Sequence, residues 1–124
     1  MISVFSLLLQ SLFFRDQKEP SGSCGENLTW SLDTETNKLT ISGSGKMTDY
    51  LYYKNTPWYP YCHSIELIVI ENGVTSIGNG VFSECSNLTS VTISDSVTSI
   101  GEYSFYNCTS LISINIPDNV TSIK

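Results

Sequence analysis

The most reactive side chains in this sequence are its thiols. Three of the four cysteines, Cys62, Cys85 and Cys108, follow one another at a constant interval of 23 residues. Thiols placed in this way could bind a metal ion, close one disulfide between neighbours, or pack in a core as small apolar side chains. The constant interval favours core packing, because equivalent residues of successive repeats stack and three thiols in a row cannot all pair. Cys24 lies in the linker before the repeats, where nothing in the sequence fixes its position.

The single histidine, His63, directly follows Cys62, and such a pair could act as a nucleophile and its base. Successive side chains on an extended backbone point to opposite sides, so a buried Cys62 implies that His63 faces the solvent. We therefore expect a surface histidine without a catalytic role. The sequence contains no phosphate-binding loop, nucleophile elbow or zinc signature. It predicts no catalytic, cofactor-binding or metal-binding residue, and an enzyme is not expected.

Asp95 and Asp118 are also one interval apart, and each follows an apolar segment. Carboxylates stacked about 5 Å apart repel one another, so they either share a cation such as Ca²⁺ or face the solvent. Ser96 and Asn119, which follow them, are residue types that are common in turns. Two solvated turns are therefore expected, with a calcium site as the alternative.

Four Asn-x-Ser/Thr sequons could carry glycans in a eukaryotic secretory route. They begin at Asn27, Asn87, Asn107 and Asn119. The same combinations also arise wherever repeat positions favour Asn and Thr. The sequons are therefore candidate glycosylation sites but only weak indicators of the compartment.

A repeat determines where most of these residues lie. Segments 74–96 and 97–119 read VTSIGNGVFSECSNLTSVTISDS and VTSIGEYSFYNCTSLISINIPDN, and they are identical at 11 of 23 positions. Residues 120–123 begin a third copy, and a more divergent copy precedes position 74. A strict period of this length predicts a solenoid in which each copy forms one coil.

Stacked coils place equivalent strands side by side in a parallel sheet, about 4.8 Å apart. Apolar residues at equivalent positions then form continuous ladders through the core. The expected ladders are Tyr59–Phe82–Phe105, Ile65–Leu88–Leu111, Ile70–Ile93–Ile116 and Ile77–Ile100–Ile123. Gly78 and Gly101 recur just after the Ile of the last ladder, where we expect a positive φ or a close backbone approach. Pro117 is expected to end a strand.

The motif Val-Thr-Ser-Ile-Gly-x-x-x-Phe-x-x-Cys-x-x-Leu-x-x-(Val/Ile)-x-Ile strongly resembles the BspA-type leucine-rich repeat. This family occurs in surface proteins of bacteria and of anaerobic parasitic protists. The resemblance covers about residues 24–124, and it includes the lead-in segments LTWSL at 28–32, LTISGSG at 39–45 and TPWY at 56–59. Pro60 departs from the family pattern and should limit residues 56–61 to a brief turn. The resemblance implies adhesion to host proteins or to other cells.

The lead-in also has a structural interpretation of its own. Apolar residues alternate with polar ones in 28–32 and again in 39–41, which predicts two strands joined by a turn at 33–37. This hairpin, which carries Trp30, could cover the open end of the first coil. Thr56 before Pro57 resembles a helix N-cap. The expected fold is mainly β: a leucine-rich-repeat solenoid of 23-residue repeats, with a parallel β-sheet on one face and an N-terminal β-hairpin cap.

Three segments make up the expected domain organisation. Residues 1–23 comprise an apolar, signal-peptide-like run without charges up to position 14 and a polar linker over 15–23. The run is shorter than the roughly 20 residues that span a bilayer, so a secretory signal or uncleaved anchor is expected, and a terminus without a targeting role is the alternative. Residues 24–61 form the capping segment. Residues 62–124 are the repeats, truncated inside a third copy.

The charge and the repeat together predict the class of function. The formal charge of −6, from 12 acidic and 6 basic residues, disfavours nucleic acid and anionic membranes as partners. We expect a secreted or cell-surface interaction module that binds a protein or glycoconjugate on host or other cells, with no cofactor and no small-molecule substrate. The binding face would comprise the outward strand positions Glu66, Leu67, Val69, Ser90, Thr92, Ser113 and Asn115.

Two further expectations follow from the incomplete third copy. A solenoid needs a cap at each end, so the last coil could associate with a second copy of the chain. The alternative to an interaction module is a truncated, non-functional or purely structural fragment of a longer repeat protein.

Overall fold

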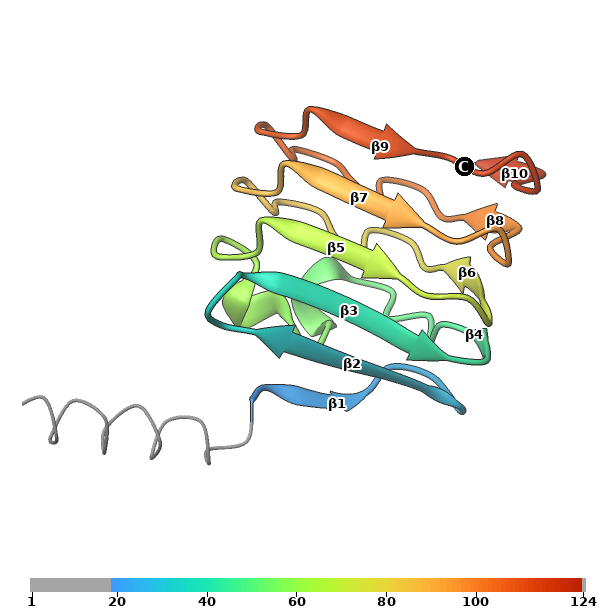
Figure 1. Ribbon diagram of the computed structural model, residues 1–124, viewed down its shortest axis with the longest axis horizontal. Helices are drawn as coiled ribbons and strands as arrows, with labels where there is room; N and C mark the ends of the chain where they lie inside the picture. Colours follow the sequence, from blue (N-terminus) through green and yellow to red (C-terminus); the bar gives the residue numbers. More distant parts are fainter. Residues whose placement is uncertain (1–18, 124) are drawn as a thin grey trace, which may run out of the picture.

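Two sheets enclose an apolar core in residues 19–123, the part of the chain that the computed structural model describes (Figure 1). Sheet A has six strands in the order β1-β2-β3-β5-β7-β9, and sheet B has four in the order β10-β8-β6-β4. The strands of sheet A are β1 (Ser21–Ser23), β2 (Leu28–Asp33), β3 (Lys38–Gly43), β5 (Leu67–Ile70), β7 (Ser90–Ile93) and β9 (Ser113–Asn115). Those of sheet B are β4 (Gly45–Lys46), β6 (Val74–Ile77), β8 (Ser99–Ile100) and β10 (Ser122–Ile123). The signal-peptide-like run lies outside the described residues.

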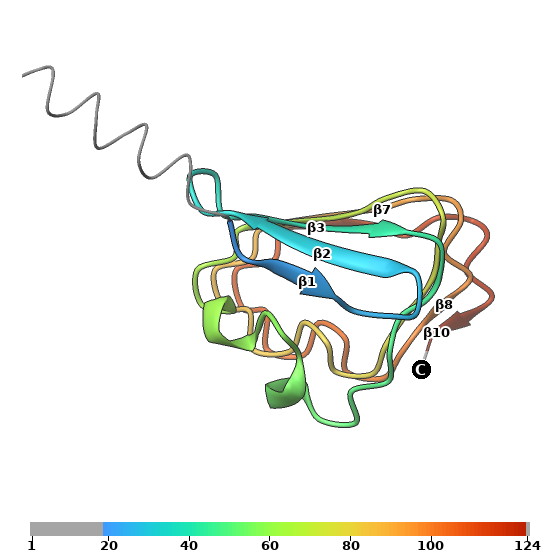
Figure 2. The same cartoon turned by 90° about the horizontal axis from the view of Figure 1, so that it is seen from below.

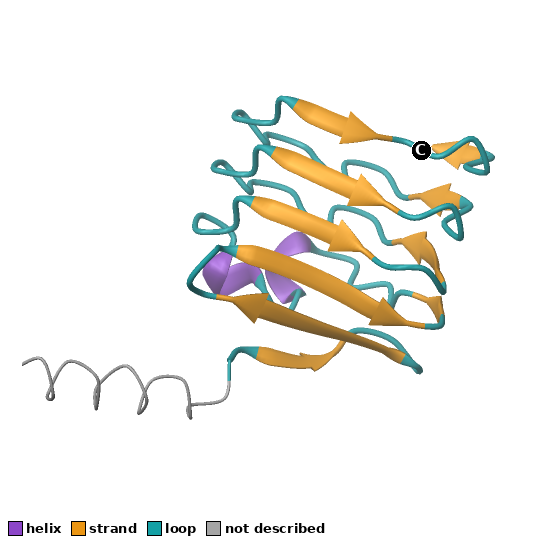
Figure 3. Cartoon of the chain, in the orientation of Figure 1, coloured by secondary structure: helices purple, strands orange, loops and turns teal. Residues whose placement is uncertain are grey.

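Helical structure in the described residues is limited to two short 3-10 helices, η1 (Tyr53–Asn55) and η2 (Tyr59–Tyr61) (Figure 3). They lie with the loops across the core from sheet A (Figure 2). Among residues 19–123, no helix has both the length and the apolar composition that are needed to cross a membrane. Each coil therefore runs from sheet A through sheet B and returns along the loop side.

The register of the parallel strands confirms that one repeat forms one coil. Leu67 pairs with Ser90, which pairs in turn with Ser113, and each step is 23 residues. In sheet B, Ile77 pairs with Ile100 at the same step. The predicted leucine-rich-repeat solenoid is therefore the observed fold.

The predicted hairpin is also present. Strands β2 and β3 pair antiparallel from Leu28 with Gly43 to Asp33 with Lys38. The Asp33 carboxylate accepts hydrogen bonds from the backbone N–H groups of Glu35 at 2.9 Å and Thr36 at 3.3 Å, which fixes the turn between the strands. Because β3 also pairs in parallel with β5, the hairpin continues the repeat sheet at its N-terminal end.

The expectation of a linker over residues 15–23 is wrong for residues 21–23. Ser21–Ser23 form β1, which pairs antiparallel with β2 and satisfies the outer backbone edge of that strand. Cys24, which was expected to lack a fixed position, is only 1% exposed. Its N–H donates to Leu28 O at 3.0 Å, and its carbonyl accepts from Thr48 N at 2.9 Å. The cap therefore begins several residues earlier than the composition suggests.

The aromatic ladder contains Trp58 in place of the expected Tyr59. The Trp58, Phe82 and Phe105 rings stack in sequence, with centroids 5.5 Å apart at each step. Tyr59 instead begins η2 and packs edge-on against Tyr53 at 5.8 Å. The short helix shifts the inward-pointing position by one residue relative to the later coils.

The segment around Pro60 forms only a brief 3-10 turn, as expected, but the predicted N-cap at Thr56 is wrong. Thr56 follows η1 as its C-cap, and its hydroxyl donates to Tyr53 O at 3.0 Å. Trp58 precedes η2 and makes no side-chain capping hydrogen bond. The threonine hydroxyl therefore binds back to the first carbonyl of η1 and does not cap η2.

The ladders are well buried in the first coils and open towards the last described coil. Ile70 is 1% exposed and Ile93 is 5% exposed, whereas Ile116, in the same ladder, is 43% exposed. Among the described residues, no coil follows to cover it. Gly101 shows the close approach that was expected, because a Cβ there would overlap with Gly78 and Asn79 of the preceding coil. Neither Gly78 nor Gly101 is among the glycines with positive φ.

Candidate functional site

The outer face of sheet A brings together the residues that the sequence placed in a binding face. Inward positions such as Ile68 and Val91 are buried, whereas the positions between them are half-buried or exposed. Register aligns Leu67, Ser90 and Ser113 in one row and Val69, Thr92 and Asn115 in the next. Glu66 is exposed and lies at the margin of this face, just before β5.

The same rows extend into the cap, which the sequence interpretation did not include. Lys38 lies beside Leu67 and Thr40 beside Val69, and Ser31 lies beside Thr40. The alternation of residues 38–43 predicts a strand with an outward face. It does not predict that this strand pairs with β5 and so joins the repeat sheet. The outer face of sheet A is thus a continuous surface across cap and repeats.

The centre of this face carries no ionisable side chains. Its centre carries hydroxyl, amide and aliphatic groups, which can donate and accept hydrogen bonds but cannot activate a nucleophile. Charges lie towards one margin, where Asn37 Nδ2 donates to Glu66 Oε2 at 2.6 Å. Nearby, backbone hydrogen bonding, led by the N–H of Glu35, holds the pKa of Asp33 below its ordinary value. The arrangement is suited to recognition of another surface.

The cysteine series packs in the core, as the interval predicted. Cys62 and Cys85 are buried, Cys108 is half-buried, and all three are free thiols. Burial raises the pKa of Cys62 and Cys85, and it raises that of Cys108 to about 11. Burial also raises the pKa of Cys24 to about 12. These thiols are therefore protonated at neutral pH and are poor nucleophiles.

His63 faces outward while Cys62 points into the core, so the two side chains do not form a nucleophile and base. The Nδ1 atom of His63 shares a hydrogen bond of 3.0 Å with Ser86 Oγ, one interval further along the chain. Asp95 and Asp118 are exposed in turns. No group of three or more His, Cys, Asp and Glu side chains within residues 19–123 could hold a metal ion.

Three of the four sequon asparagines connect neighbouring coils. Asn119 Nδ2 donates to Asp95 O at 2.9 Å, Asn107 Nδ2 donates to Glu84 Oε1 at 3.1 Å, and Asn87 Nδ2 donates to His63 O. The atom that would carry a glycan is therefore already used between coils. The Asn27 side chain is exposed and makes no hydrogen bond to the residues that the structure describes.

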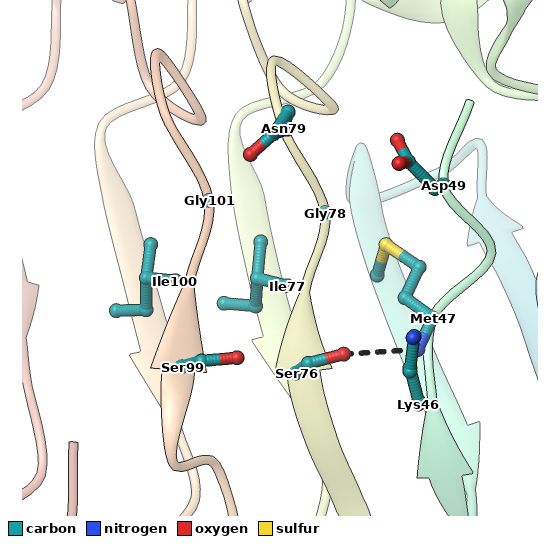
Figure 4. A pocket seen from close by; sticks show the side chains of 10 residues that line it. All are labelled: Lys46, Met47, Asp49, Ser76, Ile77, Gly78, Asn79, Ser99, Ile100 and Gly101. Carbon is teal, nitrogen blue, oxygen red and sulfur yellow. Dashed lines mark hydrogen bonds between the residues drawn. The ribbon is translucent and has the colours of Figure 1, made fainter. Parts of the chain in front are cut away.

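A shallow hollow of about 260 Å³ runs beside sheet B (Figure 4). Its lining comes from β4, β6 and β8 and the residues that follow them, and Ser76 Oγ accepts a hydrogen bond from Met47 N at 3.3 Å. Ionisable groups in the lining are limited to Lys46 and Asp49. The lining contains no histidine or cysteine that could serve as a base or nucleophile.

Comparison with known proteins agrees with the geometry. The family model described as BspA type leucine rich repeat region (6 copies) matches residues 55–124. No curated protein matches the sequence. A leucine-rich repeat protein from Eubacterium ventriosum ATCC 27560 is similar in structure, with a TM-score of 0.78 and 34% identity over 86% of this chain and 28% of that one. The chain thus spans less than a third of that relative.

Two further solved structures are more distant. A leucine-rich repeat protein from T. pallidum has a TM-score of 0.55 and 16% identity, over 82% of this chain and 52% of that one. A leucine rich cell surface protein from Faecalibacterium prausnitzii A2-165 has a TM-score of 0.49 and 24% identity, over 86% of this chain and 33% of that one. The T. pallidum protein shares the fold alone. The repeat motif, the observed coils and the family match together show that this chain belongs to the BspA-type leucine-rich repeat family.

Proposed function

We propose that this chain is an adhesive interaction module at the cell surface or outside the cell, where the outer face of sheet A contacts a protein or glycoconjugate on a host or neighbouring cell. BspA-type repeats are a kind of protein-interaction module, and the family is generally non-enzymatic. The described residues likewise present no activated nucleophile, since their thiols are protonated and His63 is separated from Cys62. The proposal of an external location is supported by the family and by the apolar run at the start of the sequence.

The observation that carries this proposal is the pair of outward rows. Leu67, Ser90 and Ser113 form one row and Val69, Thr92 and Asn115 form the other, so successive coils present uncharged side chains at about 4.8 Å spacing. Small side chains leave the sheet accessible, and each contributes at most a modest contact. A partner with repeated polar groups would gain affinity from many such contacts at once.

The proposal is tested by binding of the full chain to an array of host-matrix and cell-surface proteins and glycans. Thr92→Arg and Ser113→Arg place bulky charges on the two rows, and each should weaken binding at least about tenfold. Thr109→Arg adds the same group at an exposed turn outside the strands and serves as the control. Binding that is insensitive to both row variants would contradict the proposal. A folded chain that binds nothing on the array would favour the alternative of a purely structural fragment.

A second candidate interaction is self-association through the last described coil. Ile112 is 86% exposed and Ile116 is 43% exposed, and β9 has no further partner strand among the described residues. An apolar surface beside an unpaired strand edge favours pairing with a second chain. Sedimentation of the wild-type chain should show dimers, and Ile112→Lys combined with Ile116→Lys should shift it to monomer. A wild-type chain that is monomeric at all concentrations would rule this out.

A further inference from the structure

A groove of about 660 Å³ lies between η1 and the loops that follow β6 and β8. These elements are across the core from sheet A (Figure 2), so the groove is separate from the outward rows. Its lining is rich in aromatic side chains, because Tyr52, Tyr53, Tyr103 and Tyr106 all contribute. Tyr103 and Tyr106 pack edge-to-face with centroids 5.6 Å apart.

The backbone of this groove is strained at three places. Leu51 has φ 62°, Glu84 has φ 67° and Tyr103 has φ 57°, and all three line the groove. The other non-glycine residues with positive φ in the described part of the chain are Asn37 and Asn107, a residue type that tolerates this conformation. Every unfavourable left-handed residue of the described chain therefore lies at one surface site.

Core packing does not offset this strain. Leu51 is 85% exposed and Tyr103 is 68% exposed, so neither gains much from burial. One repeat earlier, the position of Tyr103 is occupied by Gly80, which has φ 64° and suits this conformation. Both coils therefore adopt the same left-handed turn, and at Tyr103 this turn presents an exposed aromatic side chain to the groove.

The charges around the groove indicate the kind of partner. Glu84 and Glu102 contribute carboxylates to the lining, and the whole chain carries a formal charge of −6. Next to the groove, the Lys54 ammonium lies 5.9 Å from the centroid of the Tyr53 ring, so this aromatic surface already accommodates one cation. Glu84 keeps part of its hydrogen-bonding capacity, because Asn107 donates only to its Oε1 atom.

We propose that this groove binds an arginine side chain within a basic segment of a partner protein. The planar guanidinium would stack on the tyrosine rings and donate to Glu84 and Glu102. Arginine fits better than lysine, because it combines a flat face with several fixed donors, whereas an ammonium is a compact charge. This site is independent of the outer face of sheet A, and either can fail without the other.

The test is titration of the full chain with a labelled, capped hexa-arginine peptide, followed by fluorescence polarisation at about 150 mM salt. Hexa-lysine and maltohexaose are the comparison ligands. We expect saturable binding of hexa-arginine, at least about threefold weaker binding of hexa-lysine, and no binding of maltohexaose. Glu84→Gln combined with Glu102→Gln should weaken hexa-arginine binding at least about tenfold.

A matched control separates the groove from general attraction between opposite charges. Glu26→Gln combined with Glu35→Gln removes the same charge at exposed positions outside the groove and should change binding less than about twofold. Tyr103→Gly should also weaken binding without lowering the unfolding temperature, because glycine suits the left-handed conformation.

Three results would overturn the proposal. The first is no saturable binding of hexa-arginine to a chain with native circular dichroism. The second is an equal loss of binding in both double variants, which would show nonspecific charge attraction. The third is binding of maltohexaose in place of hexa-arginine, which would identify a carbohydrate site.

Discussion

The indole of Trp58 stacks on the ring of Phe82 with a centroid separation of 5.5 Å, and its Nε1 donates to Val81 O at 2.7 Å. The two stacked residues are 24 positions apart, one more than the repeat interval. Trp58 is completely buried and also packs against Trp30 of the cap, at 6.1 Å. This side chain therefore joins the capping hairpin to the first regular coil.

Removing that connection should destabilise the fold strongly. Trp58→Ala is expected to lower the free energy of unfolding by about 3–5 kcal/mol, because it leaves a cavity and an unpaired Val81 carbonyl. The neighbouring Tyr59→Ala, at a half-buried position, should lower it by less than about 1.5 kcal/mol. Urea denaturation of both variants measures the difference. Equal losses would indicate that Tyr59 shares the ladder position.

Gly80 and Tyr103 occupy equivalent positions of two repeats, both with positive φ, and substitutions there should change stability in opposite directions. Tyr103→Gly should raise the free energy of unfolding by about 0.5–1 kcal/mol, since it relieves strain at φ 57° and removes little burial. Gly80→Ala should lower it by about 1 kcal/mol, since alanine is disfavoured at φ 64°. Thermal unfolding measures both. A Tyr103→Gly variant that is clearly less stable would show that the tyrosine packs productively.

The buried thiols should make stability fall in alkaline solution. Burial raises the pKa of Cys108 from 9.0 to about 11 in the folded chain. The Cys108 thiol releases its proton at a lower pH in the unfolded chain than in the folded chain. The stabilisation that the protonated thiol contributes is therefore fully present below pH 9.0 and is lost as the pH rises through about 11. Urea denaturation at a series of pH values measures this decline. Cys108→Ala should make it shallower, and an unchanged slope in this variant would contradict the assignment.

The sequon asparagines should differ in their structural roles. Asn87→Ala removes a hydrogen bond to the His63 carbonyl of the preceding coil and should lower the free energy of unfolding by about 1 kcal/mol. Asn27→Ala removes an exposed side chain and should change stability by less than about 0.5 kcal/mol. In a eukaryotic secretory host, a glycan at Asn27 is accordingly the one expected to leave the unfolding temperature unchanged. Peptide mass mapping and calorimetry test this, and a large loss on glycosylation of Asn27 would contradict it.

The alternation of side chains made the outer face of sheet A predictable. The groove lined by Tyr52, Tyr53, Tyr103 and Tyr106 could not be predicted in this way. Leu67, Ser90 and Ser113 repeat at one interval on strands, so their outward direction follows from the two-residue period of a strand. Leu51 lies outside the regular repeats, and the groove also needs segments 79–84 and 102–106. No local pattern in the sequence predicts that these three segments lie together.

The sequence alone determined the solenoid, the capping hairpin and the outward rows, because each depends on a short period that one coil repeats on the next. Tertiary structure alone decided that Ser21–Ser23 would pair with β2, that Cys24 would be buried, and that Trp58 would replace Tyr59 in the ladder. These features lie in the irregular lead-in, where no equivalent residue precedes them in the chain. Their positions follow from which side chains fill the end of the core and which backbone groups find partners, and those conditions exist only once the coils have stacked.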